Sequence, residues 1–171
     1  MNTIVRICLT GFMGSGKSTV GKKLAHRLNY PFIDLDDAIT DFTGQSITEL
    51  FNNKGEAAFR EIESQVLERV LNENRNTIIS LGGGTVCFGN NLSLIKSKAI
   101  LVYLELPPKA LFNRLVNAKK NRPLLENLID AELEQYIQTK LGEREVYYKQ
   151  AHHTFNGLSL NVEEIIQAVN V

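Results

Sequence analysis

A glycine-rich segment at residues 11–18, GFMGSGKS, constrains this chain more than any other part of it. It follows a short apolar run at 4–10 and leads into an amphipathic stretch at 17–28, so it connects a predicted strand to a predicted helix. In that context the pattern G-x-x-x-x-G-K-[ST] turns backbone N–H groups toward phosphate oxygens, and the helix adds the positive end of its dipole. The segment therefore predicts a parallel α/β fold that binds a nucleotide through its phosphates.

Side chains of this phosphate loop have expected roles as well. Lys17 is expected to reach the β- and γ-phosphates, and Ser18 is expected to ligate Mg²⁺, the predicted cofactor. The predicted contacts to ATP are Gly14, Ser15, Gly16, Lys17, Ser18 and Thr19.

Short apolar runs alternate with longer amphipathic stretches along the whole chain, which is typical of a parallel sheet with crossover helices. Because the 171 residues contain no internal repeat and no long linker, we expect one domain spanning 1–171. Ser46 with Glu49 has the pattern of a capping box, and Asn161 is suited to cap the last helix. Strands are predicted at 4–10, 31–34, 77–81, 99–106 and 153–155, and helices at 17–28, 36–42, 46–53, 56–71, 92–96, 108–117, 131–150 and 162–169.

The composition limits the classes of partner and the cellular location. Nineteen basic side chains balance nineteen acidic ones, so no global field would attract nucleic acid or an anionic membrane. The apolar runs are too short to span a bilayer, and Cys8 and Cys87 lack the spacing of a disulfide scaffold or a zinc site. We expect a cytoplasmic protein that binds neither nucleic acid nor membrane.

Two carboxylates, Asp34 and Asp36, follow the second predicted strand, at the sheet edge where ligands of open α/β folds bind. Alternation along an extended strand would place both on the same side. In phosphoryl transfer, one carboxylate can hold a metal-bound water while another orients or deprotonates the acceptor hydroxyl. The alternative interpretation is that Asp36 or Asp37 only caps the following helix.

Glycines and arginines supply further candidates for ligand contacts. Three glycines at 82–84 are expected where backbone approaches a ligand closely, although they could also form a simple turn after the strand. Arg60 lies beside the apolar face of a predicted helix and Arg144 lies in a late helix. Arg122 lies in a basic, aperiodic segment at about 118–130, where a lid is expected. A surface arginine paired with a nearby glutamate is the alternative for each.

A phosphate loop alone does not distinguish a kinase from a nucleotide-driven switch or motor. A GTPase-like switch needs a guanine-reading Asn-Lys-x-Asp, and the nearest match, NKGE at 53–56, ends in Glu and lies between helices. A nucleic-acid-driven ATPase would need a basic track, which the balanced charge does not favour. A kinase is therefore the favoured class.

Taken together, these motifs resemble those of the shikimate kinase family. The resemblance runs from Ile7 to the final helix and is carried by the phosphate loop, DLD at 34–36, FREIE at 59–63, SLGGG at 80–84, RPLL at 122–125 and REVYY at 144–148. It implies transfer of the ATP γ-phosphate to the 3-hydroxyl of shikimate, giving shikimate 3-phosphate and ADP in chorismate and aromatic amino acid biosynthesis. It also implies a three-layer α/β/α fold like that of nucleoside monophosphate kinases, with five parallel strands in the order 2-3-1-4-5.

The resemblance further implies a substrate-binding region at about 34–62, a lid at about 118–130, and a monomer. Ser18 would ligate Mg²⁺ directly and Asp34 through water, while Arg114 would stack on adenine and Arg122 would reach the nucleotide phosphates. The implied catalytic residues are Lys17, Asp34, Asp36 and Arg122. The implied shikimate contacts are Asp36, Arg60, Gly82, Gly83, Gly84 and Arg144.

Physical chemistry agrees with this allocation, because two guanidiniums suit a carboxylate and a carboxylate suits vicinal hydroxyls. Two alternatives stay open at this point. One is another small-molecule kinase, such as a gluconate or nucleotide kinase, and the other is a nucleotide-binding regulator without turnover.

Overall fold

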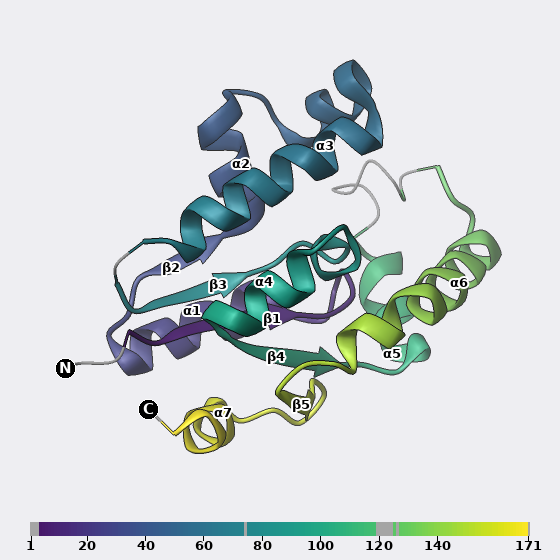
Figure 1. Ribbon diagram of the computed structural model, residues 1–171. Helices are drawn as coiled ribbons and strands as arrows, with labels where there is room; N and C mark the ends of the chain where they lie inside the picture. Colours follow the sequence, from purple (N-terminus) through teal and green to yellow (C-terminus); the bar gives the residue numbers. More distant parts are fainter. Residues whose placement is uncertain (1–3, 74, 119–124, 126, 171) are drawn as a thin grey trace.

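The sheet of this protein contains five parallel strands in the order β2-β3-β1-β4-β5, as predicted (Figure 1). The structure is a computed structural model, and it describes residues 4–73, 75–118, 125 and 127–170. The strands are β1 (Arg6–Thr10), β2 (Phe32–Asp34), β3 (Thr77–Ser80), β4 (Ile100–Glu105) and β5 (His153–Asn156).

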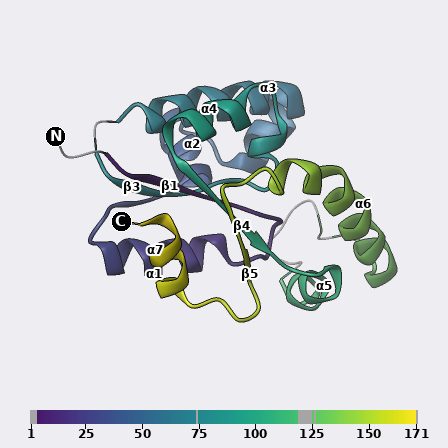
Figure 2. The same ribbon diagram turned by 60° about the horizontal axis from the view of Figure 1, so that its bottom comes forward.

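Helices cover both faces of the sheet and make three layers, which confirms the predicted fold class (Figure 2). One face carries α1 (Lys17–Leu28) and α7 (Val162–Val169), and the other carries α2 (Leu35–Thr43), α3 (Ile47–Leu71) and α4 (Asn91–Lys98). The central strand β1 shows why both faces are covered. Its Ile7 and Leu9 belong to the apolar cluster beneath α1 and α7, whereas Cys8 belongs to the cluster on the opposite face.

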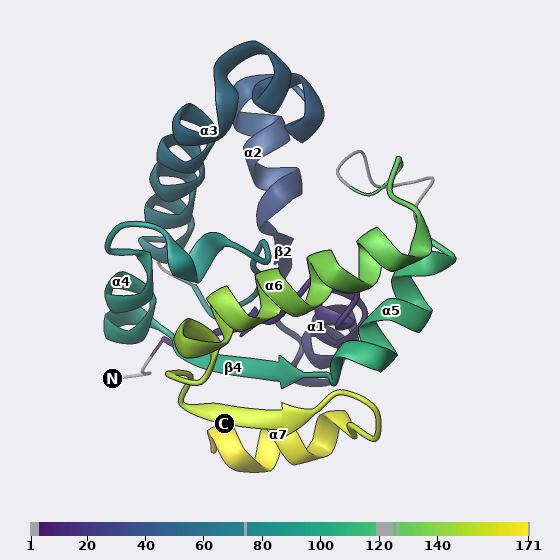
Figure 3. The same cartoon turned by 90° about the vertical axis from the view of Figure 1, so that its right-hand side faces the viewer.

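Two further helices, α5 (Pro108–Val116) and α6 (Asp130–Tyr148), follow β4 and pack against each other. Figure 3 shows α6 crossing the molecule between α2 and α3 above it and β4 and α7 below it. Helix α6 also packs against the short 3₁₀ helix η1 (Thr85–Cys87), which the sequence did not predict. This contact brings α6 to the chain that leaves β3.

Most helix ends agree with the signals in the sequence. Helices α1 and α7 have the predicted bounds, the Ser46–Glu49 capping box forms at the start of α3, and the Asn161 side chain accepts from the N–H of Glu163. The two helices predicted at 46–53 and 56–71 are confirmed, although the single label α3 covers both. They meet at a kink where Gly55 has φ 79° and ψ 171°. No helix among the described residues is long and apolar enough to cross a membrane.

Candidate active site

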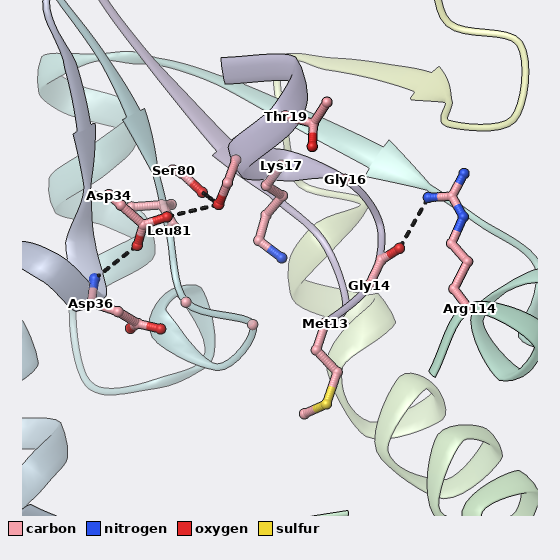
Figure 4. Close-up of a pocket in the computed structure, with 13 residues that line it drawn as sticks. Met13, Gly14, Gly16, Lys17, Thr19, Asp34, Asp36, Ser80, Leu81 and Arg114 are labelled. Carbon is pink, nitrogen blue, oxygen red and sulfur yellow. Dashed lines mark hydrogen bonds between the residues drawn. The ribbon is translucent and has the colours of Figure 1, made fainter. Parts of the chain in front are cut away.

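A cavity of about 480 Å³ opens at the carboxyl ends of β1, β2 and β3 (Figure 4). Because β1 and β2 flank β3, the order of the strands brings the phosphate loop, the chain after β2 and the chain after β3 to one edge. The residues that line the cavity are Met13, Gly14, Gly16, Lys17, Ser18, Thr19, Asp34, Asp36, Ser80, Leu81, Gly82, Gly83 and Arg114.

The phosphate loop has the backbone that its glycines predict. Gly16 has φ 93° immediately before α1, in the left-handed region that glycine adopts at least cost. The ammonium of Lys17 folds back over the loop, where its Nζ donates to the carbonyl of Gly11 at 2.8 Å and to that of Phe12 at 3.0 Å. Ser15 is buried, and its hydroxyl has no hydrogen-bond partner among the described residues.

Oxygen donors gather where α1 begins. The hydroxyl of Ser18 donates to Asp34 Oδ2 at 2.7 Å and lies 3.3 Å from the hydroxyl of Ser80 (Figure 4). A carboxylate and hydroxyls are hard ligands of the kind that Mg²⁺ prefers. No cluster of three or more His, Cys, Asp or Glu side chains suited to a metal occurs among the described residues.

Asp34 and Asp36 both line the cavity. The prediction that alternation along an extended strand places them on the same side is wrong. Strand β2 ends at Asp34, so Asp36 lies in the first turn of α2 rather than on an extended strand. The cap of α2 is Asp34, whose Oδ1 accepts from the N–H of Asp36 at 3.1 Å. The alternative in which Asp36 or Asp37 serves as the cap is therefore wrong as well.

The surroundings of Asp36 make it a better base than an ordinary aspartate. Desolvation by the cavity walls, followed by the negative charges of Asp34 and Glu63, raises the pKa of Asp36 from 3.8 to about 6, against the lowering effect of Lys17. The side chain remains exposed to the cavity. It can therefore meet a ligand and can take up a proton near neutral pH.

Arg60 pairs with a nearby glutamate, as the alternative interpretation expected, but that glutamate is the buried Glu63, to which the sequence analysis assigned no role of its own. Arg60 Nη1 donates to Glu63 Oε2 at 2.8 Å, and the hydroxyl of Thr85 donates to Glu63 Oε1 at 2.7 Å. Glu63 is only 1% exposed. A signal was available, because Glu63 occupies a position of the buried α3 face between Phe59 and Val66, where an unpaired glutamate would be costly.

The second arginine reaches the glycines from α6. Arg144 Nη1 would lie 3.3 Å from a Cβ placed on Gly83, and Arg60 Nη2 would lie 2.5 Å from a Cβ placed on Gly84. Any side chain at position 84 would therefore displace Arg60. Both arginines line a second cavity of about 630 Å³ that also touches Gly84 and Cys87, so the two cavities meet at the glycines.

At the other end of the phosphate loop, Arg114 Nη1 donates to the carbonyl of Gly14 at 3.0 Å (Figure 4). The predicted stacking of Arg114 on adenine stays a prediction. Arg122, at the centre of the predicted lid, lies outside the described residues, as do the rest of 119–124 and residue 126.

Comparison with known proteins decides the family. Residues 13–170 match the family model described as shikimate kinase. A shikimate kinase from Bacteroides thetaiotaomicron is 44% identical over 153 residues, which cover 90% of this chain and 87% of the relative. The chain belongs to the shikimate kinase family.

Solved structures of the family agree closely with this kinase. The crystal structure of the shikimate kinase from Bacteroides thetaiotaomicron has a TM-score of 0.93 and 39% identity, covering 99% of this chain and 100% of that one. Shikimate kinase from Acinetobacter baumannii, solved in complex with shikimate, has a TM-score of 0.87 and 32% identity, covering 98% of this chain and 94% of that one. The predicted class of enzyme, a kinase, is thereby confirmed in place of a regulator without turnover.

Proposed function

We propose that the phosphate loop of this kinase binds ATP and that the Arg60–Arg144 side of the cavity binds shikimate, whose 3-hydroxyl receives the γ-phosphate. One observation carries the proposal: Lys17 and Asp36 line one cavity, two arginines line the next, and the glycines at 82–84 separate them. A small acceptor held at these glycines lies within reach of both the phosphate loop and the guanidiniums.

The acceptor side fits shikimate by charge and by hydrogen bonding. The acceptor carboxylate pairs with Arg60 and Arg144, which offer forked donors. The N–H of Gly83 donates to a hydroxyl of the acceptor, and the carboxylate of Asp36 accepts from a hydroxyl. Asp36 then orients the attacking hydroxyl and accepts its proton. Its raised pKa supports this role, because a base with a pKa near the working pH transfers protons efficiently.

The nucleotide side relies on Lys17. When a phosphate enters the loop, the ammonium exchanges the carbonyls of Gly11 and Phe12 for phosphate oxygens, which carry more charge. Lys17 then neutralises charge that builds on the γ-phosphoryl oxygens during transfer. Arg114 is proposed to contact the adenine and Arg122 the phosphates.

The donors around Ser18 fit Mg²⁺, because this ion is usually held by one or two carboxylates together with waters and substrate phosphates. Ser18 would hold it directly and Asp34 through water. When bound with ATP, the ion offsets phosphate charge. The absence of a larger acidic cluster among the described residues is compatible with such a site.

We also propose that the protein is a monomer in the cytoplasm. Among the described residues, the large exposed apolar side chains are few and belong to different segments: Phe42, Ile129, Val146, Tyr147 and Leu158. Both Cys8 and Cys87 are free thiols, as expected in a reducing compartment.

A coupled assay of ADP release tests the proposal with four classes of acceptor: shikimate, quinate, gluconate and nucleoside monophosphates. We expect ATP turnover that depends on shikimate and yields shikimate 3-phosphate. Faster turnover with gluconate or a nucleoside monophosphate than with shikimate would overturn the assignment of the acceptor.

A further inference from the structure

Tyr148, the last residue of α6, is a fully buried tyrosine whose hydroxyl lies at the acceptor site. Its ring stacks against Tyr103 of β4, with ring centroids 5.1 Å apart. Its Oη donates to the carbonyl of Gly83 at 2.5 Å. A side chain from α6 therefore holds the backbone that follows β3, across 65 residues of sequence.

Arg144 lies beside the same hydroxyl. It stands one turn earlier on α6, and its positive charge and its polar contact with Tyr148 lower the pKa of the tyrosine against the larger effect of burial. A guanidinium can only donate, so it faces the oxygen of the hydroxyl, whose proton goes to Gly83. Burial raises the pKa of Tyr148, so the hydroxyl keeps its proton and remains a donor to the carbonyl at neutral pH.

The bond to Gly83 matters because three consecutive glycines have little of their own to fix their conformation. Holding the carbonyl of Gly83 fixes the plane of the peptide that joins Gly83 to Gly84, because peptide units are planar. On the other side of this segment, Arg60 crowds Gly84 and is held by Glu63. Tyr148 supplies the corresponding restraint on the side of Arg144.

Arg144 itself is placed by two contacts of different kinds. Its guanidinium lies over the ring of Phe12, 5.7 Å from the ring centroid, and also lies beside the hydroxyl of Tyr148. The ring contact can be kept while the guanidinium rotates, whereas a polar contact with a hydroxyl favours one orientation. Arg144 Nη1 also lies 3.3 Å from the place of a Cβ on Gly83, so the hydroxyl, the guanidinium and the Gly83 backbone lie together.

We propose that Tyr148 is a positioning residue for the acceptor: its hydroxyl couples Arg144 to the Gly83 peptide, so that the acceptor carboxylate meets an arginine and a backbone segment already set relative to each other. The inference rests on the proposed function. Tyr148 acts through its two neighbours and does not touch the acceptor.

The experiment compares Tyr148→Phe with Tyr103→Phe in the full chain. Both variants keep the stacked pair of rings, but only the first removes the hydroxyl that lies beside Arg144 and donates to Gly83. For Tyr148→Phe we expect KM for shikimate to rise about 5- to 20-fold, with kcat and KM for ATP changed less than about two-fold. Tyr103→Phe should leave all three constants within about two-fold of the parent.

Two further measurements separate positioning from a general loss of packing. With a shikimate analogue that lacks the carboxylate, Tyr148→Phe should lose much less than it loses with shikimate. In an Arg144→Ala background, the same substitution should have little further effect on shikimate KM, because its target is gone.

Equal losses with both acceptors, additivity with Arg144→Ala, or an unchanged shikimate KM would each overturn the proposal. These results are distinct from a failure of the proposed function, in which the unmodified chain would not phosphorylate shikimate at all. The double-variant comparison remains decisive even if Tyr148→Phe lowers the melting temperature, because the same packing change is introduced once into the parent and once into the Arg144→Ala background, and the two effects on shikimate KM are compared.

Discussion

The phosphate loop draws its ligand-facing groups from consecutive residues at 11–18, whereas the acceptor cluster collects Asp36, Arg60, the glycines at 82–84 and Arg144 from four separate parts of the chain. The loop holds its own lysine, since Lys17 bonds to carbonyls five and six residues away. The cluster instead depends on side chains that join one element to another.

These joining side chains are Glu63 and Tyr148. Glu63 ties Arg60 of α3 to Thr85 of η1, and Tyr148 ties α6 to Gly83. A local site is limited by backbone geometry, while an assembled site is limited by the interactions that fix its parts relative to each other. Substitutions in the two regions should therefore fail in different ways.

The largest effect is expected in the phosphate loop. Lys17→Ala should lower kcat by more than about 1,000-fold while the fold stays intact, because the lost ammonium stabilises charge that develops only during transfer. Coupled ADP release measures turnover, and circular dichroism melting checks the fold. Shikimate affinity should fall far less than turnover.

Lys23→Ala, an exposed substitution on the same helix, is the matched control and should behave as the parent. Near-normal turnover in folded Lys17→Ala would refute the role of this lysine.

The next largest effect is expected at Asp36, the proposed general base. Asp36→Asn should lower kcat by about 100- to 1,000-fold, because the amide cannot take up the proton of the attacking hydroxyl. In the parent, kcat/KM for shikimate should rise with pH through about 6, where Asp36 loses its proton, and this acid limb should be absent from the variant. A pH series of initial rates tests both statements.

Protonation of Asp36 also determines whether the stability of the fold rises or falls with pH. The folded protein binds the Asp36 proton more tightly than the unfolded chain, so the folded state becomes relatively less stable as pH rises from about 4 to about 6. Asp36→Asn should remove this slope and gain most in melting temperature, relative to the parent, at neutral pH. A variant that loses stability there would contradict the raised pKa.

Replacing the two arginines should separate losses of shikimate affinity from losses of stability inside the acceptor cluster. Arg60→Ala and Arg144→Ala should each cost about 2 to 4 kcal/mol of shikimate binding, measured by isothermal titration, since each loses charge-assisted bonds to the carboxylate. Arg60→Ala should also lower the melting temperature more, because it leaves the carboxylate of Glu63 buried beside only Thr85.

Adding Glu63→Gln to Arg60→Ala should restore most of that stability but none of the affinity. If Arg144→Ala weakened shikimate and a carboxylate-free analogue equally, the assignment of Arg144 to the carboxylate would be wrong.

A smaller effect is expected from the proposed metal ligand. Asp34→Asn should raise the Mg²⁺ concentration needed for half-maximal rate by about ten-fold, because it weakens the donor set around Ser18. A magnesium titration at saturating ATP and shikimate measures it, with Asp36→Asn as the comparison that leaves this requirement unchanged. If Asp36→Asn raised the Mg²⁺ requirement and Asp34→Asn did not, Asp36 would be the metal ligand and Asp34 the general base.

The smallest effect is expected at the edge of the loop. Arg114→Ala should raise KM for ATP about three- to five-fold through loss of an exposed contact, with KM for shikimate unchanged. Arg27→Ala, on another exposed arginine, serves as the control. A change in KM for shikimate without a change in KM for ATP would contradict the assignment of Arg114 to the nucleotide side of the site.

The difference between the two regions also explains what the sequence could predict. The strand order came from the resemblance, and α1 and α7 were predicted to the residue because their signals are local, such as the cap at Asn161. The bounds around Asp36 were predicted to within one residue, but the alternation argument for Asp34 and Asp36 failed, because periodicity cannot show that Asp34 caps α2 and places Asp36 in its first turn.

The joining side chains were missed for a different reason. A glutamate or a tyrosine within a helix carries no local sign of the partner it meets across the fold, and Tyr148 meets Gly83 only because α6 packs against the chain after β3. Only the spacing of Glu63 on a buried helix face gave a hint.

The kink at Gly55 divides α3 into two cooperative units. The helical ladder of N–H to C=O bonds cannot run through a residue with φ 79° and ψ 171°, so opening of the turns at 47–54 does not propagate into those that follow. The later part holds most of the buried side chains of the helix, including Phe59 and Glu63, and it carries Arg60. Local unfolding can therefore loosen the turns before Gly55 while Arg60, the arginine proposed to bind the carboxylate, stays anchored among the buried side chains that follow the kink.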